Sequence, residues 1–567
     1  MSSAAVQTLW AELVAATLAD AGVQLVVLSP GSRSTPLAAA FAAEPRLELV
    51  TIIDERAAAF FALGAARASG IPAAVACTSG SAAAHYLPAI VEASAAGVPL
   101  VVLTADRPPE LLACGANQTI DQVKMYGTAA RGAFDLGAPE GSDLALRALR
   151  RKIAQAVALS RGPHAGPVHL EVPLRKPLEP AAPATDAEHA AARIVAALRA
   201  QPLVAAAPRL VADPAAVDAL AAAIAAEPHG VIAAGALPAG TARDAVYALA
   251  ARTGYPILAE TGSQLRLGPH PAAVTVVDHA ELVAIAPALV LQLGAEPLVA
   301  LAAPARYVLA PHAWQDPDSS ARGVIIGDLA ATLAALTTRV PTRGSGEWAA
   351  AWRAADQRAA AALDRALAAH PRNEVSAVRA AIDAAPTAQL QLGNSLPVRV
   401  ADLAARSGTG PARPVLTQRG ASGIDGLVAS AAGATRSGPV LLVLGDVSFA
   451  HDVGGLLAAR EATAPLAIVV VDNAGGRIFD GLPIGRAALA PATYARCFTT
   501  PPGLDPVAVA RAFGARGVLA ETPAALAAAV AAALEQRGPT VIHAPVSPTG
   551  AHDVKRTARE LLAGEPS

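Results

Sequence analysis

At 567 residues the chain is too long for one ordinary domain, and three or four domains are expected. Its 44 basic and 46 acidic residues give a net charge of −2 with no basic block, which argues against nucleic acid as a main partner. Hydrophobic residues reach 53% because alanine is abundant, but the apolar runs are interrupted and shorter than the ~20 residues of a spanning helix, so we expect no membrane span.

The N-terminus and the cysteines both bear on the location of the protein in the cell. The N-terminus carries Glu12 and Asp20 but no basic cluster, which predicts an amphipathic helix and not a signal peptide. The three cysteines, Cys77, Cys114 and Cys497, lie far apart and form no CxxC pair, so neither a disulfide framework nor a zinc site is expected. This pattern favours a reducing, cytoplasmic location.

The first segment alternates predicted strands and helices, and a polar cluster follows each strand. The strands are 25–29, 47–53, 73–77 and 100–103, and the clusters are 30–36, 54–56, 78–81 and 104–108, with a further polar loop at 115–122. Ligands of open α/β sheets bind outside the carboxyl ends of the strands, so these loops predict a substrate-facing rim. Arg33, beside the free amides of the next helix, is typical of an anion site, and Ser34 or Thr35 is expected to cap that helix.

The first and last segments end in a similar way. A predicted helix at 144–159 precedes the strand GPVHLEVPL at 166–174, and a predicted helix at 524–534 precedes the strand GPTVIHAPV at 538–546. Both strands begin with Gly-Pro and end with proline and an apolar residue. This weak internal repeat predicts two domains of related topology at the two ends of the chain.

Between them, four strand-like runs (GVIAAG, YPILAE, ALVLQLG and GVIIGD) carry few polar clusters, which favours a central Rossmann-like spacer domain. Linkers are predicted at 177–190 and 337–346. The fold class is therefore α/β, with three doubly wound parallel-sheet domains. Their predicted bounds are 1–180, 191–338 and 372–567.

The stretch from Gly438 to Phe479 holds the strongest functional signal. Its apolar runs, 440–444 and 466–471, have the length and β-branched content of strands that are buried on both faces of a parallel sheet. Gly445 and Asp446 follow the first run, and the second is followed by Asp472, Asn473, Ala474, Gly475 and Gly476. Both clusters are expected to face one crevice, at the carboxyl ends of the strands.

These two clusters offer oxygen ligands. The Asp446 carboxylate, the Asn473 amide oxygen and the Gly475 carbonyl form a set that suits an octahedral Mg²⁺ with room for phosphate oxygens. The glycines allow a diphosphate to approach the backbone closely. Asn473 follows Asp446 by 27 residues in a glycine-rich loop, and this spacing resembles the diphosphate–metal motif of thiamine-diphosphate enzymes.

With these motifs assembled, the chain resembles the 2-succinyl-5-enolpyruvyl-6-hydroxy-3-cyclohexene-1-carboxylate synthase family of menaquinone biosynthesis. The resemblance rests on SPGSRSTPL (29–37), DERAAAFFALG (54–64), TSGSA (78–82), LTADRP (103–108), GANQTIDQ (115–122), GNSLPVR (393–399), RGASGIDG (419–426), GDVSFAHD (445–452) and DNAGGRIF (472–479). It implies three domains of the thiamine-diphosphate enzyme type. The first would bind the cofactor's pyrimidine and the last its diphosphate through Mg²⁺, with Mn²⁺ as an alternative. The two halves of one site would come from different subunits of a homodimer or tetramer.

The resemblance also implies roles for single residues. Glu55 would be catalytic, because its carboxylate would hydrogen-bond the pyrimidine ring nitrogen. The metal ligands would be Asp446, Asn473 and Gly475. The cofactor-binding set would be Glu55, Thr78, Gly80, Ser422, Ile424, Gly445, Asp446, Val447, Ser448, Asn473, Gly475, Gly476 and Ile478. The substrate-binding set would be Ser32, Arg33, Arg107, Asn117, Gln118, Ser395, Arg399, Arg419, Ile478 and Phe479.

The implied reaction makes the protein a transferase. It would decarboxylate 2-oxoglutarate and add the resulting succinic-semialdehyde carbanion to isochorismate. Each substrate carries two carboxylates, which arginine forks bind well, and this accounts for the arginines in the substrate set. Two alternatives remain open: a simple thiamine-dependent 2-oxoacid decarboxylase, and a non-catalytic cofactor-binding protein.

Five residues depart from the family pattern. His85 stands where Asn is usual, Asp472 where Asn is usual, Arg477 where Gly is usual and Pro502 where His is common. Val447 differs from the general Gly-Asp-Gly triad, as it does in this family. None of these changes removes a proposed catalytic group, but Arg477 lies beside the cofactor loop and is expected to alter its local contacts.

Overall fold

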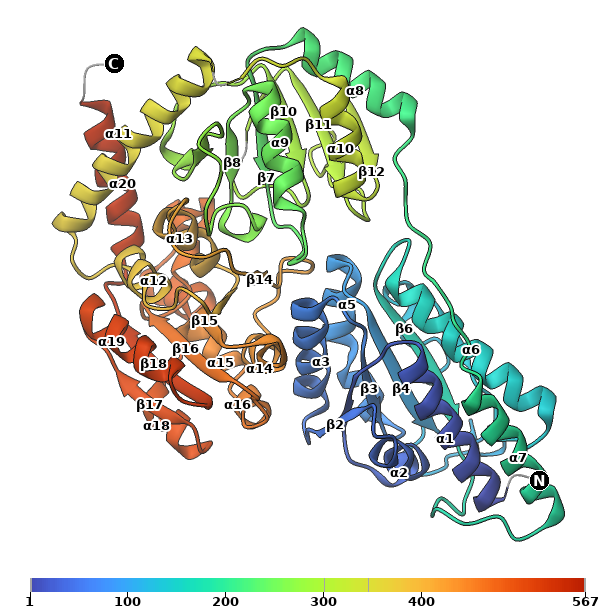
Figure 1. The fold of residues 1–567 in the computed structure, drawn as a ribbon. Coiled ribbons are helices and arrows are strands. Elements are labelled where there is room, and N and C mark those ends of the chain that lie inside the picture. The colour runs from blue at the N-terminus through green and yellow to red at the C-terminus, as the bar shows by residue number, and fades with distance from the viewer. Residues whose placement is uncertain (1–2, 300, 345, 565–567) are drawn as a thin grey trace. The chain divides into compact units, whose positions relative to one another are not determined.

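The computed structural model describes residues 3–299, 301–344 and 346–564. Their strands form three six-stranded sheets in which every strand pairing is parallel, and helices flank the sheets (Figure 1). The predicted α/β class with three parallel sheets is therefore confirmed. Each sheet lies within one of the three predicted domains, whose exact bounds stay predictions.

The first sheet has the strand order β2-β1-β3-β4-β6-β5. Its strands are β1 (Leu25–Leu28), β2 (Glu48–Thr51), β3 (Ala73–Cys77), β4 (Leu100–Asp106), β5 (Ala133–Asp135) and β6 (Pro167–Pro173). The accompanying helices are α1 (Ala4–Asp20), α2 (Thr35–Ala43), α3 (Glu55–Ser69), α4 (Ser81–His85), α5 (Leu87–Ala96), α6 (Asp143–Arg161) and α7 (Asp186–Ala200). Helix α1 differs from the prediction, because it is buried on most of its surface against α2, α6 and α7 and is not exposed along one face.

The third sheet repeats this topology. Its order is β14-β13-β15-β16-β18-β17, which matches the first sheet strand for strand. Its strands are β13 (Gln389–Leu392), β14 (Val415–Thr417), β15 (Val440–Gly445), β16 (Pro465–Asp472), β17 (Arg516–Leu519) and β18 (Gly538–Pro545). The two Gly-Pro strands of the sequence repeat become β6 and β18, in corresponding places. The prediction of related topology at the two ends is thus confirmed.

The central sheet has the order β12-β11-β10-β7-β8-β9, which is the order 3-2-1-4-5-6 of a Rossmann fold viewed from the other side. Its strands are β7 (Gly230–Ala234), β8 (Ile257–Ala259), β9 (Val276–Val277), β10 (Leu289–Leu293), β11 (Ala305–Ala310) and β12 (Gly323–Ile326). Its helices are α8 (Pro214–Ala226), α9 (Arg243–Thr253) and α10 (Leu329–Arg339). The predicted Rossmann-like topology is confirmed.

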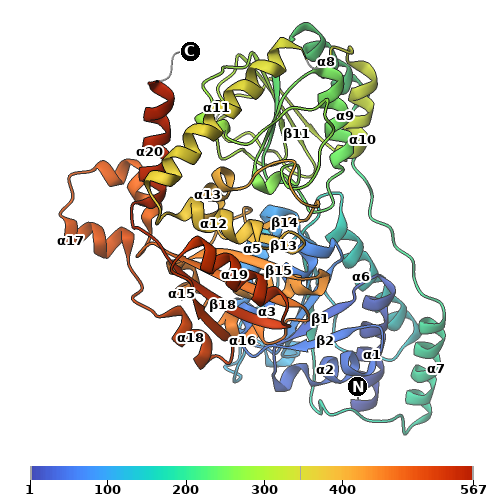
Figure 2. The ribbon, with the colours of Figure 1, turned by 60° about the vertical axis from the view of Figure 1, so that its left-hand side comes forward.

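The remaining helices follow the central sheet in the chain. They are α11 (Glu347–Ala369), α12 (Glu374–Asp383), α13 (Leu396–Ala404), α14 (Leu427–Ala434), α15 (Asp446–His451), α16 (Gly455–Ala459), α17 (Pro491–Tyr494), α18 (Pro506–Ala512), α19 (Pro523–Leu534) and α20 (Gly550–Ala563). Helices α11 and α20 pack side by side, as Figures 1 and 2 both show. None of the helices in the described residues is long and apolar enough to cross a membrane.

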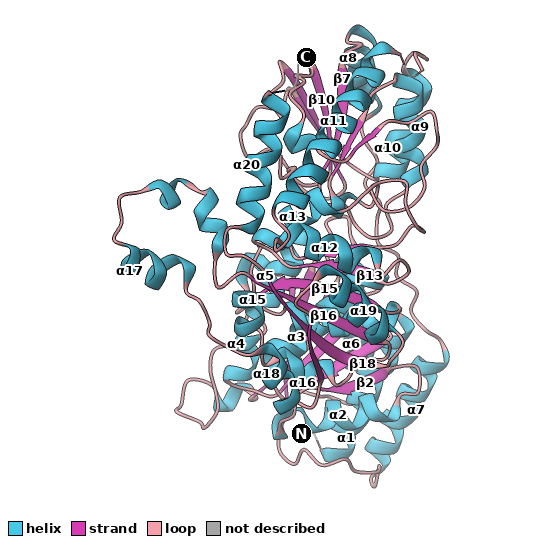
Figure 3. Ribbon diagram, turned by 90° about the vertical axis from the view of Figure 1, so that its left-hand side faces the viewer, coloured by secondary structure: helices cyan, strands magenta, loops and turns pink. Residues whose placement is uncertain are grey.

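Contacts divide the chain into two compact units. The first comprises residues up to Pro208 together with 419–437 and 454–461, and the second comprises 209–418, 438–453 and the residues from Ala462 onward. Within the first unit, α14 packs closely on α3, because a Cβ at Gly64 would lie 1.9 Å from the carbonyl oxygen of Ser430. Within the second unit, the segment that carries α17 extends away from its sheet (Figure 3).

Candidate functional site

Strands β15 and β16 lie side by side and bring two of the predicted motifs together. They pair in register from Val440 with Leu466 to Gly445 with Val471. Asp446 begins α15 directly after β15, and its Oδ2 accepts a hydrogen bond from the Gly475 backbone N–H, 2.7 Å away. Its Oδ1 accepts from the Val447 N–H at 2.9 Å. The two predicted clusters therefore do face one crevice, and Asp446 links them.

The carboxylates in this crevice have shifted pKa values. Burial raises the pKa of Asp446 to about 6, and the nearby Asp472 carboxylate adds to the shift, while the Val447 and Gly475 amides oppose it. The pKa of Asp472 is lowered, chiefly by the hydrogen bond from His543 Nε2 at 2.9 Å. Asp472 is therefore ionised. A cation bound nearby would favour the ionised form of Asp446 as well.

Gly475 adopts a backbone conformation that favours glycine, with φ of +119°. A Cβ at this position would lie 2.2 Å from the carbonyl oxygen of Thr499. That same carbonyl accepts the N–H of Gly476 at 2.6 Å. Glycine is therefore required at position 475 by the close packing of this loop against Thr499.

Asn473 is held on two sides. Its Nδ2 donates to Oε1 of Glu374 at 3.0 Å, and its backbone carbonyl accepts from Nε of Arg477 at 3.1 Å. Its Oδ1 accepts no hydrogen bond from the described residues. Arg477, one of the residues that depart from the family pattern, therefore bonds back to the start of its own loop at Asn473. Its carbonyl oxygen lies 3.0 Å from Nε2 of His552.

Sequence reasoning missed Glu374, which is the first residue of α12 and only 2% exposed. Burial raises its pKa, against the lowering effect of the Asn473 N–H. Its only sequence signal is its place after Asn373, a good helix cap, and an acidic residue in a first helical turn is ordinarily a complement to the helix dipole.

A cavity opens over these residues. It is lined by Glu374, Val378, Ser395, Leu396, Pro397, Val400, Gly445, Asp446, Val447, Ser448, Val471, Asn473, Gly475, Gly476 and Arg477. Its polar lining supplies a carboxylate, an amide oxygen and backbone carbonyls, and its wall from α13 is apolar. The oxygen set and the two glycines fit a hard divalent cation with a diphosphate.

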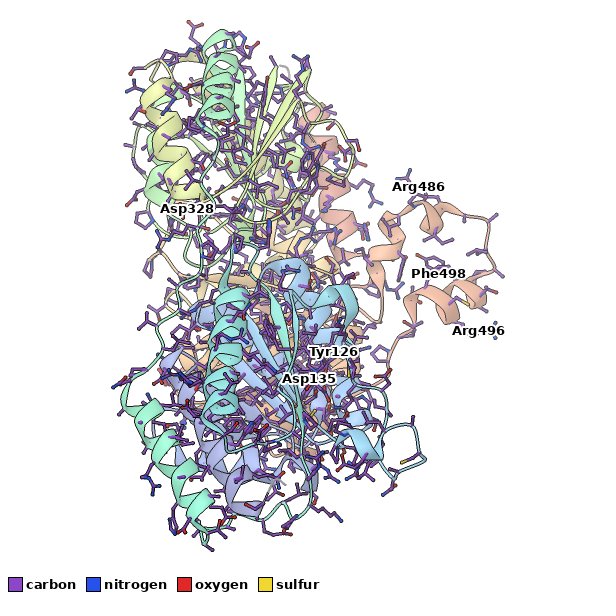
Figure 4. The ribbon with its side chains drawn as sticks, turned by 90° about the vertical axis from the view of Figure 1, so that its right-hand side faces the viewer. Tyr126, Asp135, Asp328, Arg486, Arg496 and Phe498 are labelled. Atoms are coloured by element: carbon purple, nitrogen blue, oxygen red, sulfur yellow. The ribbon has the colours of Figure 1, made fainter. Side chains whose placement is uncertain are left out.

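Not every predicted residue of the second unit lines this cavity. Ile478 and Phe479 follow it directly, and the Phe479 ring packs on Phe498 with centroids 5.6 Å apart. Phe498 lies on the extended α17 segment (Figure 4). Arg399, on α13, lines a different cavity that also contains Arg266.

The first unit gathers the N-terminal motifs. The Arg33 N–H donates to Oγ1 of Thr78 at 3.1 Å, so the clusters after β1 and β3 meet. The Arg33 side chain is 3% exposed, and its NH1 donates to the Leu174 carbonyl at 2.7 Å. No carboxylate of the described residues lies within ion-pairing distance of this buried guanidinium, which suits an incoming anion. Ser34 does take the predicted cap position of α2, but its hydroxyl donates to the Gly31 carbonyl and caps no amide.

The loop 115–122 packs on the cluster after β3. Gln118 Nε2 donates to the Ser79 carbonyl at 2.9 Å, and the Gly80 N–H donates to Oε1 of Gln122 at 2.9 Å. Arg107 donates to the Asn117 carbonyl through both Nε and NH2. The structure therefore joins Ser32, Arg33, Thr78, Gly80, Arg107, Asn117 and Gln118 into one rim of loops.

Glu55 is the first residue of α3, which Asp54 caps through the Ala57 N–H. The loop 419–426 belongs to the same unit and also contacts α3, because a Cβ at Gly426 would overlap the Phe60 ring. This loop is fixed by Glu92, which accepts the Gly420 and Ala421 N–H groups. Arg419, Ser422 and Ile424 are thus carried on the same unit as Glu55.

Backbone strain marks three of the predicted residues. Gln118, Ser395 and Ser422 have φ of +55°, +71° and +62°, in the left-handed region that non-glycine residues rarely adopt. Ala474, in the loop after β16, has φ of +60°. Such conformations cluster at functional sites, where surrounding structure enforces them.

A buried polar network beneath the rim was also missed. Thr104 Oγ1 donates to Glu171 Oε2 at 2.6 Å and lies 2.7 Å from Nε2 of His169. Gln122 Nε2 donates to Oε1 of the same glutamate at 3.3 Å. Burial, with the neighbouring Glu171, raises the pKa of Asp106 to about 7. Strand β4 pairs with β6 as far as Asp106, beyond the predicted end at 103.

The other departures lie apart from these contacts. His85 is exposed at the end of α4. Pro502 is partly buried in the segment between Thr499 and α18, and nothing in the structure explains its replacement of histidine. The three cysteines are free, with Cys77 buried.

Two family models match this chain. Residues 10–125 match the thiamine pyrophosphate enzyme N-terminal TPP binding domain, and residues 404–544 match the thiamine pyrophosphate enzyme C-terminal TPP binding domain. The structure is also similar to benzoylformate decarboxylase from Polynucleobacter necessarius, with a TM-score of 0.71 over 95% of this chain and 98% of that chain. At 17% identity this similarity supports the fold alone.

Curated relatives match almost the full length. The 2-succinyl-5-enolpyruvyl-6-hydroxy-3-cyclohexene-1-carboxylate synthase of Sorangium cellulosum is 42% identical, over 99% of this chain and 95% of the relative. The enzyme of that name from Roseiflexus castenholzii is 40% identical, over 94% of this chain and 95% of the relative. The one from Geobacillus kaustophilus is also 40% identical, over 88% of each chain. The chain therefore belongs to the 2-succinyl-5-enolpyruvyl-6-hydroxy-3-cyclohexene-1-carboxylate synthase family of thiamine pyrophosphate enzymes.

Proposed function

We propose that this chain is a thiamine-diphosphate-dependent transferase that decarboxylates 2-oxoglutarate and joins the remaining four-carbon unit to isochorismate. The products are 2-succinyl-5-enolpyruvyl-6-hydroxy-3-cyclohexene-1-carboxylate and CO₂, as in menaquinone biosynthesis. The observation that carries this proposal is the near-full-length similarity to the synthases, in a chain that keeps the oxygen set of Asp446, Asn473 and Gly475.

When bound, thiamine diphosphate supplies a carbon nucleophile and an electron sink, which a 2-oxo acid needs in order to lose CO₂. Asp446, the Asn473 amide oxygen and the Gly475 carbonyl would hold Mg²⁺, or Mn²⁺ in its place, against the diphosphate. Gly475 and Gly476, which line the same cavity and carry no side chains, would lie beside the diphosphate.

Glu55 would hold a proton at the cofactor's pyrimidine ring. It begins α3 with a partly buried side chain, and the neighbouring Asp54 already caps that helix. Helix capping is therefore accounted for without Glu55, which leaves its carboxylate for the ring. A carboxylate hydrogen bond of this kind is strongest in a water-poor site, which a bound cofactor would create.

The arginines would bind the substrate carboxylates. Arg33 is buried without an anionic partner among the described residues, and Arg107 already orients the 115–122 loop through the Asn117 carbonyl. Guanidinium groups stay charged when buried and bind carboxylates through two hydrogen bonds. A dicarboxylate donor and a dicarboxylate acceptor would use several such groups, which include Arg419 in this chain.

The active form would be a homodimer or a tetramer in the cytoplasm. The predicted pyrimidine-binding residues lie in the first compact unit and the metal set lies in the second. In the family arrangement that the sequence implies, two copies of the chain contribute these two sets to one site.

Product analysis tests the proposal. Purified protein with thiamine diphosphate and Mg²⁺ is incubated with 2-oxoglutarate, with and without isochorismate, and CO₂ and the adduct are measured. We expect the adduct to form and CO₂ release to depend on isochorismate. Release of CO₂ at the same rate without isochorismate would support a simple decarboxylase, and an inert protein that retains cofactor would support a non-catalytic role.

A further inference from the structure

The side chain of Asn473 can present either an oxygen or an NH₂ group to the metal cavity. The two orientations of a terminal amide occupy nearly the same space, but only the oxygen can bind a cation. Something other than shape must therefore choose between them. In this structure the choice is made by the hydrogen bond from Nδ2 to Oε1 of Glu374, at 3.0 Å.

Oε1 of Glu374 accepts the hydrogen bond from Asn473, so the NH₂ group faces Glu374. The amide oxygen then faces the opposite way, and it accepts no hydrogen bond from the described residues. Asp446 and Gly475, the other two proposed ligands, line the same cavity as Asn473 and Glu374. A reversed amide would place an NH₂ group where the cation needs an oxygen.

Glu374 is itself held firmly. It is 2% exposed at the first turn of α12, where the helix dipole favours a negative charge. Its Oε2 lies at the start of α20, so close that a Cβ at Gly550 would be 2.7 Å away. Burial raises the pKa of this carboxyl overall, and the Asn473 NH₂ and the Ala551 N–H act in the opposite direction. One oxygen of Glu374 thus accepts from Asn473, while the other lies beside the start of α20 and makes no hydrogen bond with the described residues.

We propose that Glu374 is a positioning residue that locks the Asn473 amide with its oxygen toward the metal. This inference rests on the proposed function, because it assumes a divalent cation at Asp446, Asn473 and Gly475. Glu374 does not touch the cation. It acts through Asn473, as outer partners of metal ligands commonly do, and their loss typically lowers metal affinity by about 10–100-fold.

The isosteric substitution Glu374→Gln gives the sharpest prediction. Glutamine has one oxygen where glutamate has two. Oε2 of Glu374 makes no hydrogen bond with the described residues, but the Ala551 N–H at the start of α20 lies near it and would repel an NH₂ group placed there. If the glutamine oxygen faces α20, its NH₂ group faces Asn473 and forces that amide to reverse. The variant therefore keeps its volume but weakens metal binding.

Exchanging the carboxylate of Glu374 and the amide of Asn473 between the two positions should restore an oxygen ligand for the metal. In the double variant Glu374→Gln with Asn473→Asp, the glutamine NH₂ donates to one oxygen of the new aspartate. The second aspartate oxygen faces the cavity whichever way the side chain turns. The single variant Asn473→Asp instead sets two carboxylates against each other, which repel at this distance.

The experiment measures Mn²⁺ binding to the full-length chain with thiamine diphosphate, by electron paramagnetic resonance of free Mn²⁺. Thermal unfolding of the metal-free proteins is recorded alongside. Asp356→Asn is the matched control, since Asp356 is a partly buried carboxylate of α11 that accepts the Asp278 and His279 N–H groups and lies outside the metal cavity. It should lower thermal stability without changing the Mn²⁺ affinity.

We expect Glu374→Gln to raise the Mn²⁺ dissociation constant by roughly 10-fold or more and the double variant to recover most of that loss. An unchanged affinity in Glu374→Gln, or losses that simply add in the double variant, would overturn the inference. So would an equal loss of affinity in Asp356→Asn, which would indicate general destabilisation. If the parent chain bound no Mn²⁺ with thiamine diphosphate, the proposed function would fail first and the inference with it.

Discussion

The backbone N–H of Gly475 donates to Oδ2 of Asp446 across 2.7 Å, and this bond ties the loop after β16 to the end of β15. The strands themselves are adjacent and parallel, so the bond closes the mouth of the crevice between them. It also orients the Asp446 carboxylate, whose other oxygen accepts from Val447. The geometry of this pair depends on a backbone conformation that favours glycine.

Gly475→Ala should therefore disrupt the site. Alanine at φ of +119° is strained, and its Cβ would lie 2.2 Å from the Thr499 carbonyl oxygen. Backbone strain of this kind costs on the order of 1–3 kcal/mol. We expect lower thermal stability together with weaker Mg²⁺-dependent binding of thiamine diphosphate, measured by calorimetry.

Gly503→Ala is the matched control for that variant. Gly503 also has a positive φ, +62°, but a Cβ there would meet no atom within 4 Å. It should cost roughly 1 kcal/mol of stability and leave cofactor affinity unchanged. Equal cofactor affinities for Gly475→Ala and Gly503→Ala would contradict the role of Gly475.

Asp446→Ala removes both a proposed metal ligand and the acceptor of the Gly475 N–H. We expect the dissociation constant of thiamine diphosphate at saturating Mg²⁺ to rise by more than the roughly 10–100-fold that loss of an outer partner costs. Fluorescence titration would measure it. Asp480→Asn is the control, because this carboxylate of the next loop accepts from the Tyr494 hydroxyl at 2.7 Å. Unchanged affinity in Asp446→Ala would refute the metal site.

Glu55→Gln should separate chemistry from binding. The amide keeps the size of the carboxylate but loses its charge, so cofactor affinity should stay close to that of the parent. Turnover should fall by on the order of 10² or more, because proton transfer at the cofactor would lose its partner. Steady-state kinetics and cofactor titration give the two readouts.

Asp54→Asn controls for an effect on α3 itself. Asparagine caps helices about as well as aspartate, so this neighbouring change should alter neither turnover nor stability appreciably. Near-normal turnover in Glu55→Gln would reject the assigned role of Glu55. A comparable loss of turnover in Asp54→Asn would assign the effect to the helix start.

The Asp106 carboxyl predicts a pH dependence of stability. Its pKa is about 7 in the folded chain, raised by burial from the ordinary 3.8. Between these values the folded state holds a proton that the unfolded chain has released, so the free energy of unfolding falls as the pH rises from about 4 to about 7. Asp106→Asn removes this titration and should be more stable than the parent at about pH 8.

Urea unfolding of both proteins across this pH range checks the prediction. The midpoint for the parent should drop more steeply with rising pH than the midpoint for Asp106→Asn. Parallel curves would show that Asp106 is ionised in the folded protein. Asparagine suits the comparison because it keeps the size of the side chain within the buried network.

Local patterns predicted most of the fold. Runs such as 440–444 and 466–471 are short, β-branched and continuously apolar, and this pattern requires burial on both faces of a parallel sheet; they became β15 and β16. The same rule places polar residues at the carboxyl ends of strands, which is why Asp446, Asn473 and Gly475 could be identified together. The end of β4 was predicted wrongly. Thr104 and Asp106 are polar, so the strand was expected to end at residue 103, three residues before its actual end at Asp106.

The sequence by itself determined the class of fold, the repeated end topology and the meeting of the Asp446 and Gly475 clusters, because each depends on contacts between neighbouring strands or on local spacing. Only the tertiary structure placed Glu374 against Asn473, 99 residues away, and turned Arg399 toward a separate cavity. It also built the network of Thr104, His169 and Glu171 below the rim. Such pairings follow from how whole helices and strands pack in space, and no periodicity along the chain records which distant side chain will meet which.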